Sequence, residues 1–291
     1  MRVGLVGCGR WGANIARDLL SIGVRLEIAD PVTGAYASLH DLPACDAYVV
    51  ATPSTSHASV LADVLPYGKP IFCEKPLGTK LSALLALPAA ANELVFVMDK
   101  WRYHPAIEEL GRLAVAETLG ALRGVATHRL DATHAHDDVD CTWILLPHEL
   151  SIAREILGRA PVAFAASASF DRGEVVGLVS HLRTRDAAVS STISTRWPAR
   201  VRTAEAAFAD GLAAFDLADE SAIVLTRHDR TSTRINVPLA APLRRELEAF
   251  VAHVAGLGPT PKASFADGVD TVCTIERLRE LAGVDRALAG S

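Results

Sequence analysis

Aromatic residues, cysteines and long apolar runs are all scarce in this sequence. Aromatic residues make up 5% of the 291 residues, so alanine, valine and leucine must supply much of the 50% hydrophobic fraction. That composition suits helices packed on sheets. The chain is long enough for two ordinary domains and apolar enough to bury real cores. These features exclude a disordered tail, a collagen-like repeat and a disulfide-stapled miniprotein.

The cysteines form no recognisable framework. They are odd in number and scattered, with no CxxC pair: Cys8, Cys45, Cys73, Cys141 and Cys273. We therefore predict reduced thiols, with neither a disulfide framework nor a zinc site. No apolar run approaches the roughly 18 residues of a membrane helix. The apolar stretch 3–6 stops at Gly7 and is too short for a signal peptide, so we expect a cytoplasmic protein.

The sequence also lacks a basic excess. Its formal net charge is −5 and its pI is about 6.1, whereas nucleic-acid-binding domains show clustered lysine and arginine. We expect neither a nucleic acid nor a membrane as a partner.

The first third of the chain alternates short apolar strands with helical patterns. We expect strands at 2–6, 24–30, 47–52, 71–73 and 94–98, and helices at 13–20, 56–65 and 81–91. This rhythm favours a parallel sheet with right-handed crossovers.

The pattern changes after about residue 120. Strand-like segments follow one another at 122–130, 162–170, 175–183, 188–196 and 201–209, with shorter ones at 212–217, 222–226 and 234–237. Turn signals such as Asp171-Arg172-Gly173 separate several of them, which indicates an antiparallel sheet. We expect one helix at 148–157 to interrupt the strands. Two more helices should close the chain, the second at 269–281.

A GxGxxG motif lies between the first strand and the first helix. Its residues are Gly7, Cys8, Gly9, Arg10, Trp11 and Gly12. In this context the first glycine permits a tight turn, the second lets the backbone approach a pyrophosphate, and the third allows close packing of helix on strand. The phosphates would bind at the helix N-terminus, where free N–H groups favour negative charge. The motif predicts a dinucleotide site.

Asp30 ends the second strand, roughly 20 residues after the glycines. A carboxylate there can accept hydrogen bonds from both ribose hydroxyls and repels a 2′-phosphate. The next residues, Pro31, Val32 and Thr33, include no cation that could neutralise such a phosphate. We therefore predict NAD as the cofactor, with NADP less favoured. The alternative is that Asp30 only caps a turn.

Two further strand ends carry polar residues. Thr52 and Pro53 follow the third strand and lead to His57, which could contact the cofactor or simply lie in the first turn of a helix. Carboxyl ends of parallel strands line the cofactor crevice of a doubly wound sheet, so Thr52, Pro53, His57, Glu74 and Lys75 are candidate cofactor-binding residues. Glu74 and Lys75 follow the fourth strand, and a lysine there can polarise a substrate oxygen or exchange its proton.

The sequence carries the ordered motifs VGCGRWG, VVATPSTSHASV and EKP, followed by an antiparallel region. In these features it resembles the glucose–fructose oxidoreductase/inositol dehydrogenase/MocA (Gfo/Idh/MocA) family. The resemblance covers nearly the whole chain and implies an α/β protein. An NAD-binding Rossmann domain, a doubly wound parallel sheet, should span residues 1–115. An α/β domain with a large, mostly antiparallel open sheet should span residues 116–291, and its C-terminal helices can pack back on the first domain.

The resemblance also implies an activity. Members transfer a hydride between a nicotinamide cofactor and a small molecule, usually a sugar, a cyclitol or a related hydroxy or keto compound. The lysine of EKP lies in the family active site, which makes Lys75 a catalytic candidate; Glu74 and Pro76 resemble the residues that set its backbone. Arg102 and Tyr103 lie in a segment that helps line the substrate cleft, although Trp101 and Tyr103 could instead pack the domain junction.

A second family landmark is a histidine preceded by an aspartate four residues earlier. His148 matches the histidine, and we assign it catalytic and substrate-binding roles, but Ile144 stands where the acid is expected. Lys75 and His148 could act alone, or the loop before the helix could supply Asp137, Asp138 or Asp140. We assign Asp137 to substrate binding.

The clustered acids and histidines at 131–140 fit no metal template, so we predict no metal. Two alternatives to a dehydrogenase remain: a non-catalytic NAD-binding sensor or regulatory protein, which the loss of the acid at position 144 favours, and an NAD-using lyase or glycosidase. The family resemblance implies that the open sheet pairs with another subunit, so we expect a homodimer or homotetramer.

Overall fold

The computed structural model describes residues 1–132 and 138–285. The chain divides into two compact units. The first unit contains Met1–Lys100 and Ala241–Val272, and the second contains Trp101–Ala240 together with the chain from Cys273 onward. The expected domain boundary between residues 115 and 116 stays a prediction.

A five-stranded parallel sheet forms the centre of the first unit. Its strands are β1 (Arg2–Val6), β2 (Arg25–Ala29), β3 (Ala47–Val50), β4 (Ile71–Cys73) and β5 (Val95–Val97). They lie in the order β2-β1-β3-β4-β5, and every adjacent pair is parallel. The expected parallel sheet is confirmed. Because the order reverses at β1, the carboxyl ends of β1 and its neighbours form the switch point where such sheets bind ligands.

The helices of this unit are α1 (Arg10–Ser21), α2 (His57–Val64), α3 (Leu81–Leu85), α4 (Ala91–Leu94) and α7 (Pro242–Val254). The single helix expected at 81–91 is wrong. The chain leaves the helix after Leu85, and α4 starts only at Ala91, because Pro88 between them cannot donate a helical hydrogen bond. Short 3₁₀ turns flank α2 at Ser54–Ser56 and Leu65–Tyr67.

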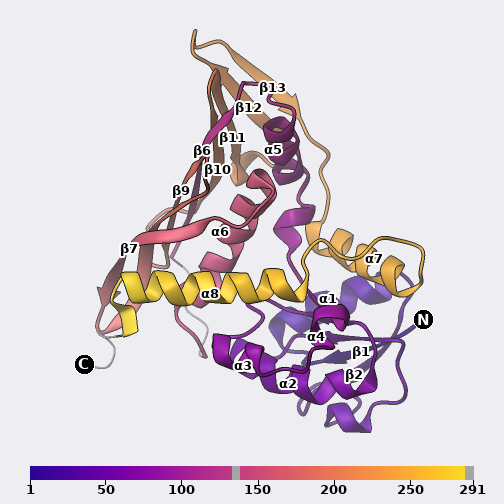
Figure 1. Ribbon diagram of the computed structural model, residues 1–291. Coiled ribbons are helices and arrows are strands. Elements are labelled where there is room, and N and C mark those ends of the chain that lie inside the picture. Colours follow the sequence, from indigo (N-terminus) through magenta and orange to yellow (C-terminus); the bar gives the residue numbers. More distant parts are fainter. Residues whose placement is uncertain (133–137, 286–291) are drawn as a thin grey trace. The chain divides into compact units, whose positions relative to one another are not determined.

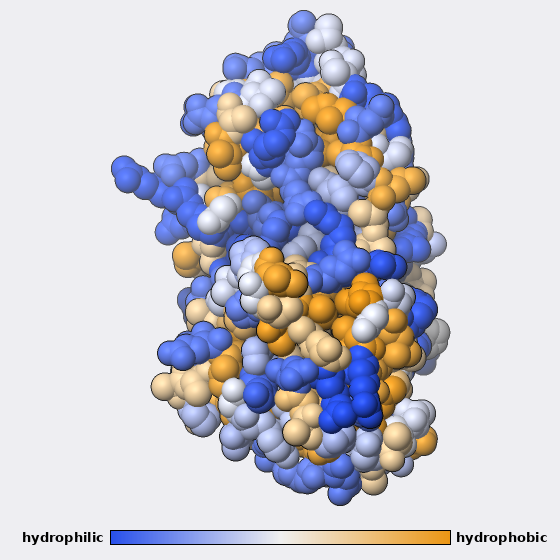
Figure 2. All heavy atoms as spheres, turned by 90° about the vertical axis from the view of Figure 1, so that its right-hand side faces the viewer, coloured by the Kyte–Doolittle hydropathy of each residue, from blue (hydrophilic) through white to orange (hydrophobic). Residues whose placement is uncertain are grey.

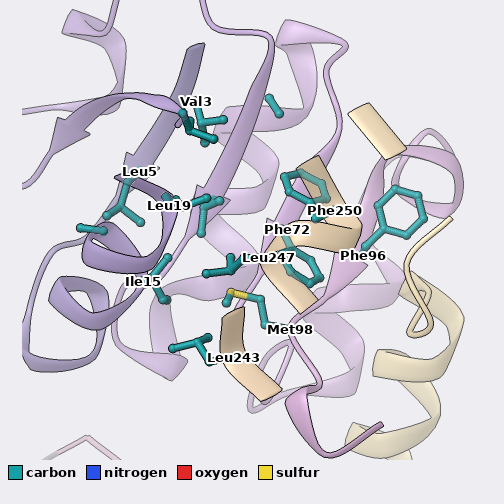
Figure 3. Close-up of a cluster of buried hydrophobic side chains, with 14 residues drawn as sticks. Val3, Leu5, Ile15, Leu19, Phe72, Phe96, Met98, Leu243, Leu247 and Phe250 are labelled. Atoms are coloured by element: carbon teal, nitrogen blue, oxygen red, sulfur yellow. The ribbon is translucent and has the colours of Figure 1, made fainter. Parts of the chain in front are cut away.

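The core of the first unit joins segments far apart in the sequence. Side chains from the sheet and from α1 meet those of α7, among them Leu243, Leu247 and Phe250 (Figure 3). The rings of Phe72 and Phe250 stack with centroids 4.7 Å apart, and neither ring is exposed. A helix near the C-terminal end of the chain therefore completes the core of the N-terminal sheet.

An eight-stranded mixed sheet dominates the second unit (Figure 1). Its strands are β6 (Leu122–Leu130), β7 (Val162–Asp171), β8 (Glu174–Arg183), β9 (Ala188–Ser194), β10 (Val201–Phe208), β11 (Gly211–Asp216), β12 (Ala222–Arg227) and β13 (Ser232–Asn236). The order is β13-β12-β11-β10-β6-β9-β8-β7, and all adjacent pairs are antiparallel except β6 and β9. The expected large, mostly antiparallel sheet and the α/β class are confirmed.

Helices α5 (Pro105–Val115) and α6 (Cys141–Leu157) pack on this sheet (Figure 1). The sequence interpretation did not include α5, whose start combines the cap His104 with Pro105 in the first turn. The expected helix at 148–157 begins seven residues later than the observed helix α6, which starts at Cys141. Asp140 caps the observed N-terminus by accepting a hydrogen bond from the Thr142 N–H, and the helix continues through Pro147.

Helix α8 (Phe265–Leu281) starts four residues before the expected helix at 269–281. Its first part belongs to the first unit and its last part to the second. Among the described residues, no helix is long and apolar enough to cross a membrane. On the face drawn in Figure 2, hydrophobic residues form small groups separated by hydrophilic ones.

Replacing Phe250 by alanine tests the contribution of α7 to this core. The cavity left beside Phe72 should lower the free energy of unfolding by about 3–5 kcal/mol. Leu257→Ala is the control, since Leu257 is 84% exposed and should change stability by about 0.5 kcal/mol at most. Urea titrations of both variants give the comparison. Equal losses for the two variants would show that α7 does not anchor the sheet.

Candidate functional site

The glycine loop turns sharply from β1 into α1. Gly7 has φ +90°, a conformation that residues with a side chain rarely adopt, and its N–H donates to the Ala29 carbonyl over 2.9 Å. A Cβ on Gly7 would lie 2.7 Å from the Ala51 carbonyl oxygen. The turn and its contact with the end of β3 therefore require glycine at this position.

The other two glycines differ from each other. A Cβ on Gly12 would lie 2.5 Å from the Gly7 carbonyl oxygen, so helix and loop can pack closely only with glycine there. A Cβ on Gly9 would meet nothing within 4 Å. Packing within the protein thus does not require glycine at Gly9, which is the exposed N-cap of α1 and lacks a side-chain cap. Open space over free N–H groups fits a pyrophosphate approaching the backbone.

Asp30 joins the glycine loop to the end of β2. One carboxylate oxygen accepts the Cys8 N–H over 2.8 Å, and the other accepts the N–H groups of Val32 and Thr33, each over 2.9 Å. The hydrogen bonds from Cys8 and Thr33 lower the pKa of Asp30 to about 2. The side chain does cap a turn, as one interpretation proposed. It also remains charged at neutral pH beside the expected ribose site.

Glu74 links the glycine loop to Lys75. One of its carboxylate oxygens accepts the Trp11 indole N–H, and the other accepts the backbone N–H of Lys75 over 2.9 Å. Lys100 lies over the Trp11 ring, with Nζ 4.6 Å from the ring centroid. A single carboxylate therefore connects two of the predicted motifs, GxGxxG and EKP.

His57 ties together two strand ends. Its side chain is buried, with Nε2 2.9 Å from the Thr52 carbonyl oxygen and Nδ1 2.7 Å from that of Pro76. The Pro53 carbonyl accepts the Ser56 N–H over 2.9 Å, and the hydroxyl oxygens of Ser56 and Thr52 lie 3.0 Å apart. The ring thus holds the loop after β3 against the loop that carries Lys75. A direct contact with a cofactor stays a prediction for His57.

Glu246 is a buried acid in the first unit that the sequence interpretation did not include. It lies on α7 with 1% of its surface exposed, and its Oε2 has no hydrogen-bond partner among the described residues. Burial raises the pKa of Glu246 well above its ordinary value. The carboxylates of Glu74 and Asp99 raise it further, whereas Lys75 and Lys100 lower it. Burial therefore favours the protonated form of this carboxyl group, which lies close to the EKP motif.

In the second unit, His148 accepts a hydrogen bond from Trp101. The indole N–H of Trp101, on the 3₁₀ turn Lys100–Tyr103, lies 2.9 Å from His148 Nδ1. The guanidinium of Arg129 lies 4.9 Å from the centroid of the Trp101 ring. Arg129 in turn forms a buried ion pair with Glu149, 2.5 Å from Nε to Oε1.

The position one turn before His148 on α6 carries isoleucine, not the expected aspartate. Ile144 lies one turn earlier on the same face of α6. Asp140 caps the helix and pairs with Arg279 over 2.5 Å, and it stands eight residues before His148. One oxygen of Asp138 is buried without a hydrogen-bond partner among the described residues. Asp137 lies outside the described residues, so its predicted contact with substrate stays a prediction.

The side chains of Arg102 and Tyr103 are both largely buried. Arg102 Nε pairs with Glu155 of α6 over 3.0 Å, and the arginine side chain is 17% exposed. Tyr103 is buried. Their roles in substrate binding stay predictions, because the contact with Glu155 accounts for the position of Arg102 without a ligand.

The structure thus assembles the predicted residues in two groups. The first unit brings together the glycine loop, Asp30, the end of β3, Glu74 and Lys75. The second holds Arg102, Tyr103 and His148. Sequence reasoning missed Glu246 and the roles of Trp101 and Arg129, since each depends on a contact distant in sequence. One sequence feature could have pointed to Arg129 and Glu246. Each is a charged residue among apolar neighbours, Arg129 in an expected strand and Glu246 in an expected helix.

The buried acid Glu246 makes a testable contribution to stability. Its raised pKa means that folding is favoured most below the ordinary glutamate pKa of about 4.3 and less as the pH rises toward the folded-state value. Glu246→Gln removes this dependence. We expect the variant to gain stability relative to wild type progressively from about pH 4.5 to pH 8, measured by urea unfolding.

Glu248→Gln on the same helix is the matched control, since Glu248 is 47% exposed and pairs with Arg244. The difference in free energy of unfolding between Glu248→Gln and the wild type should show no comparable rise with pH. If the difference in free energy of unfolding between Glu246→Gln and the wild type is also independent of pH, Glu246 is ionised in the folded protein.

Known proteins resemble this chain in sequence. Residues 24–98 match the model of the oxidoreductase family with an NAD-binding Rossmann fold, GFO_IDH_MocA. Inositol 2-dehydrogenase 2 of Saccharopolyspora erythraea is 28% identical over 57% of this chain and 56% of its own length. The rhizopine catabolism protein MocA of Rhizobium meliloti is 28% identical over 58% and 61%. The chain thus spans between half and two thirds of the length of these relatives.

Solved structures share the fold over nearly the whole chain. A UDP-N-acetylglucosamine 3-dehydrogenase from Acidithiobacillus ferrooxidans matches with a TM-score of 0.83 and 20% identity, covering 97% of both chains. A levoglucosan dehydrogenase in complex with NADH matches with a TM-score of 0.84 and 17% identity over 97% of both chains. The match over residues 24–98 and the names of the relatives agree with the sequence resemblance to the Gfo/Idh/MocA oxidoreductases.

Proposed function

We propose that this protein is an NAD-dependent oxidoreductase that transfers a hydride between nicotinamide and a sugar, a cyclitol or a related hydroxy or keto compound. The observation that carries the proposal is the Glu74 carboxylate, which connects the glycine loop to Lys75 through Trp11. This connection holds a proton-exchanging group next to a dinucleotide-binding loop. The names of the relatives support a polyol or sugar as substrate.

The residues present fit a dinucleotide. The N–H groups at the start of α1 would hold the pyrophosphate over Gly9, and Asp30 would accept hydrogen bonds from the ribose hydroxyls. Asp30 Oδ1 already accepts from the Val32 and Thr33 N–H groups and the Thr33 hydroxyl, whereas Oδ2 accepts the Cys8 N–H and has a second lone pair to offer a ribose hydroxyl. The low pKa of Asp30 keeps its charge, which repels a 2′-phosphate and supports NAD over NADP.

When bound, the nicotinamide supplies the hydride chemistry. As a neutral amine, Lys75 would take the proton of the substrate hydroxyl during oxidation, and as an ammonium it would return it during reduction. The backbone N–H of Lys75, bound to Glu74, sets where its side chain begins. Arg102, Tyr103 and His148 contribute polar contacts to the substrate.

We further propose that the open sheet of the second unit pairs two or four copies of the chain. Helices α5 and α6 pack against the sheet. Along β8, Leu178 and Leu182 are buried, whereas Val179 and His181 on the other face are exposed. An exposed, partly apolar sheet face of this kind favours an interface between copies.

A non-catalytic NAD-binding sensor or regulatory protein is the second candidate. Ile144 favours it, because no acid stands one turn before His148. The two candidates differ in one measurable respect: a sensor binds NADH but turns over none of the polyols or sugars offered to it.

Lys75→Met tests the proposed chemistry. The variant keeps a long side chain but cannot carry a proton, so turnover of an active cyclitol or sugar should fall by about 10²–10⁴-fold. Calorimetry should show NADH affinity within a few-fold of wild type. Lys80→Met is the control, because Lys80 is an exposed lysine just before α3. Turnover by Lys75→Met close to that of wild type would place the chemistry elsewhere.

Asp30→Asn tests the choice of cofactor. Loss of the charge should lower the preference for NADH over NADPH by about tenfold, in the ratio of the two dissociation constants. Asp46→Asn is the matched control: Asp46 also accepts a backbone N–H, from Arg2 over 2.7 Å, but it lies just before β3, at the amino ends of the strands. If the wild type prefers NADPH, the role proposed for Asp30 is wrong.

A further inference from the structure

The hydrogen bond between Trp101 and His148 determines which imidazole nitrogen carries the proton. An indole N–H is a donor only, so His148 Nδ1, 2.9 Å away, must accept. A nitrogen that accepts carries no hydrogen. The imidazole of His148 is therefore neutral, and its single proton resides on Nε2.

The surroundings keep Trp101 in this orientation. Its ring is 6% exposed and stacks on His104 at a centroid distance of 5.2 Å. Arg129, 3% exposed, lies over the ring and is itself held by Glu149. A guanidinium over the ring draws electron density from the indole, which makes its N–H a stronger donor.

This arrangement reverses the direction of the expected hydrogen bond. An aspartate at position 144 would lie beside His148 on α6 and accept from an Nδ1–H, leaving Nε2 free to take a proton as a base. Ile144 can accept nothing, and the Trp101 indole donates instead. Protonating Nδ1 would break the bond to Trp101 and place two hydrogens against each other.

We propose that Trp101 is a positioning residue that holds His148 as the Nε2–H tautomer, so that His148 acts as a hydrogen-bond donor to the reacting oxygen and not as a base. The proposal rests on the proposed oxidoreductase function. In oxidation, the neutral amine of Lys75 would take the substrate O–H proton, and a bound nicotinamide would supply the hydride chemistry. The Nε2–H of His148 keeps its proton throughout and stabilises the negative charge that develops on the oxygen.

The tautomer can be measured without substrate or cofactor. Side-chain ¹⁵N NMR distinguishes a protonated from an unprotonated ring nitrogen, and His148→Gln identifies the signals of His148 by their loss. At neutral pH we expect Nδ1 unprotonated and Nε2 protonated in the wild-type protein. An Nδ1–H tautomer or an imidazolium at that pH overturns the proposal.

Trp101→Phe removes the indole donor and keeps an aromatic ring. We expect the His148 signals to change to a mixture of tautomers, and Nδ1 to take a proton as the pH is lowered. Arg129, Glu149 and His104 surround the Trp101 ring and remain in the variant. Trp143→Phe is the matched control. Trp143, on α6, is buried like Trp101 and also lies beside an arginine, with the guanidinium of Arg279 5.6 Å from its ring centroid. This control should leave the His148 signals unchanged, and an equal effect of both variants counts against Trp101.

Replacements of His148 separate a donor from a base. Gln can donate a hydrogen bond but cannot take a proton, whereas Glu can take a proton but, when ionised, cannot donate. We expect His148→Gln to retain at least tenfold more kcat/KM than His148→Glu with an active polyol. The opposite order assigns His148 as the base. If the protein turns over no substrate while the NMR tautomer is as expected, the proposed function fails and the assignment of Trp101 stands.

Discussion

The hydrogen bonds of the Asp30 carboxylate are the constraint on which the first unit depends. They join the glycine loop after β1 to the end of β2, and so shape the crevice at the reversal of strand order. Glycine at positions 7 and 12 follows from this packing, because any side chain there would collide with backbone atoms. Gly9 alone is not required by contacts within the protein. Its freedom leaves the start of α1 open to a phosphate.

The acidic side chains Asp30, Glu74 and Glu246 of the first unit differ in their burial and in their hydrogen-bond partners. Asp30 and Glu74 accept backbone or indole N–H groups and connect separate loops. Glu246 is buried, with an oxygen that lacks a partner among the described residues, and its pKa is raised well above the ordinary value. Lys75 lies near the carboxylate of Glu74 and near the buried carboxyl group of Glu246.

The second unit arranges its polar residues around a single imidazole. Arg129 and Glu149 neutralise each other in a buried pair, and the pair supports the Trp101 ring. Breaking such a pair leaves an uncompensated buried charge, which is costly, so the geometry at Trp101 is strongly held. The hydrogen bond that Trp101 donates gives His148 one tautomer. The loss of the acid at position 144 therefore changes the chemistry of the histidine without leaving it unsupported.

Sequence patterns alone determined the parallel sheet, the antiparallel sheet and the local glycine turn, because period, turn residues and motif spacing act over a few neighbouring residues. They also identified Asp30 and Lys75 as residues of interest, and the family resemblance added His148. The break at Pro88, the early start of α6 and the return of α7 to the first sheet required the tertiary structure. So did the contacts of Trp101, Arg129 and Glu246. Each of these depends on what lies opposite a side chain in space, and only the folded chain brings residues 101 and 148, or 75 and 246, together.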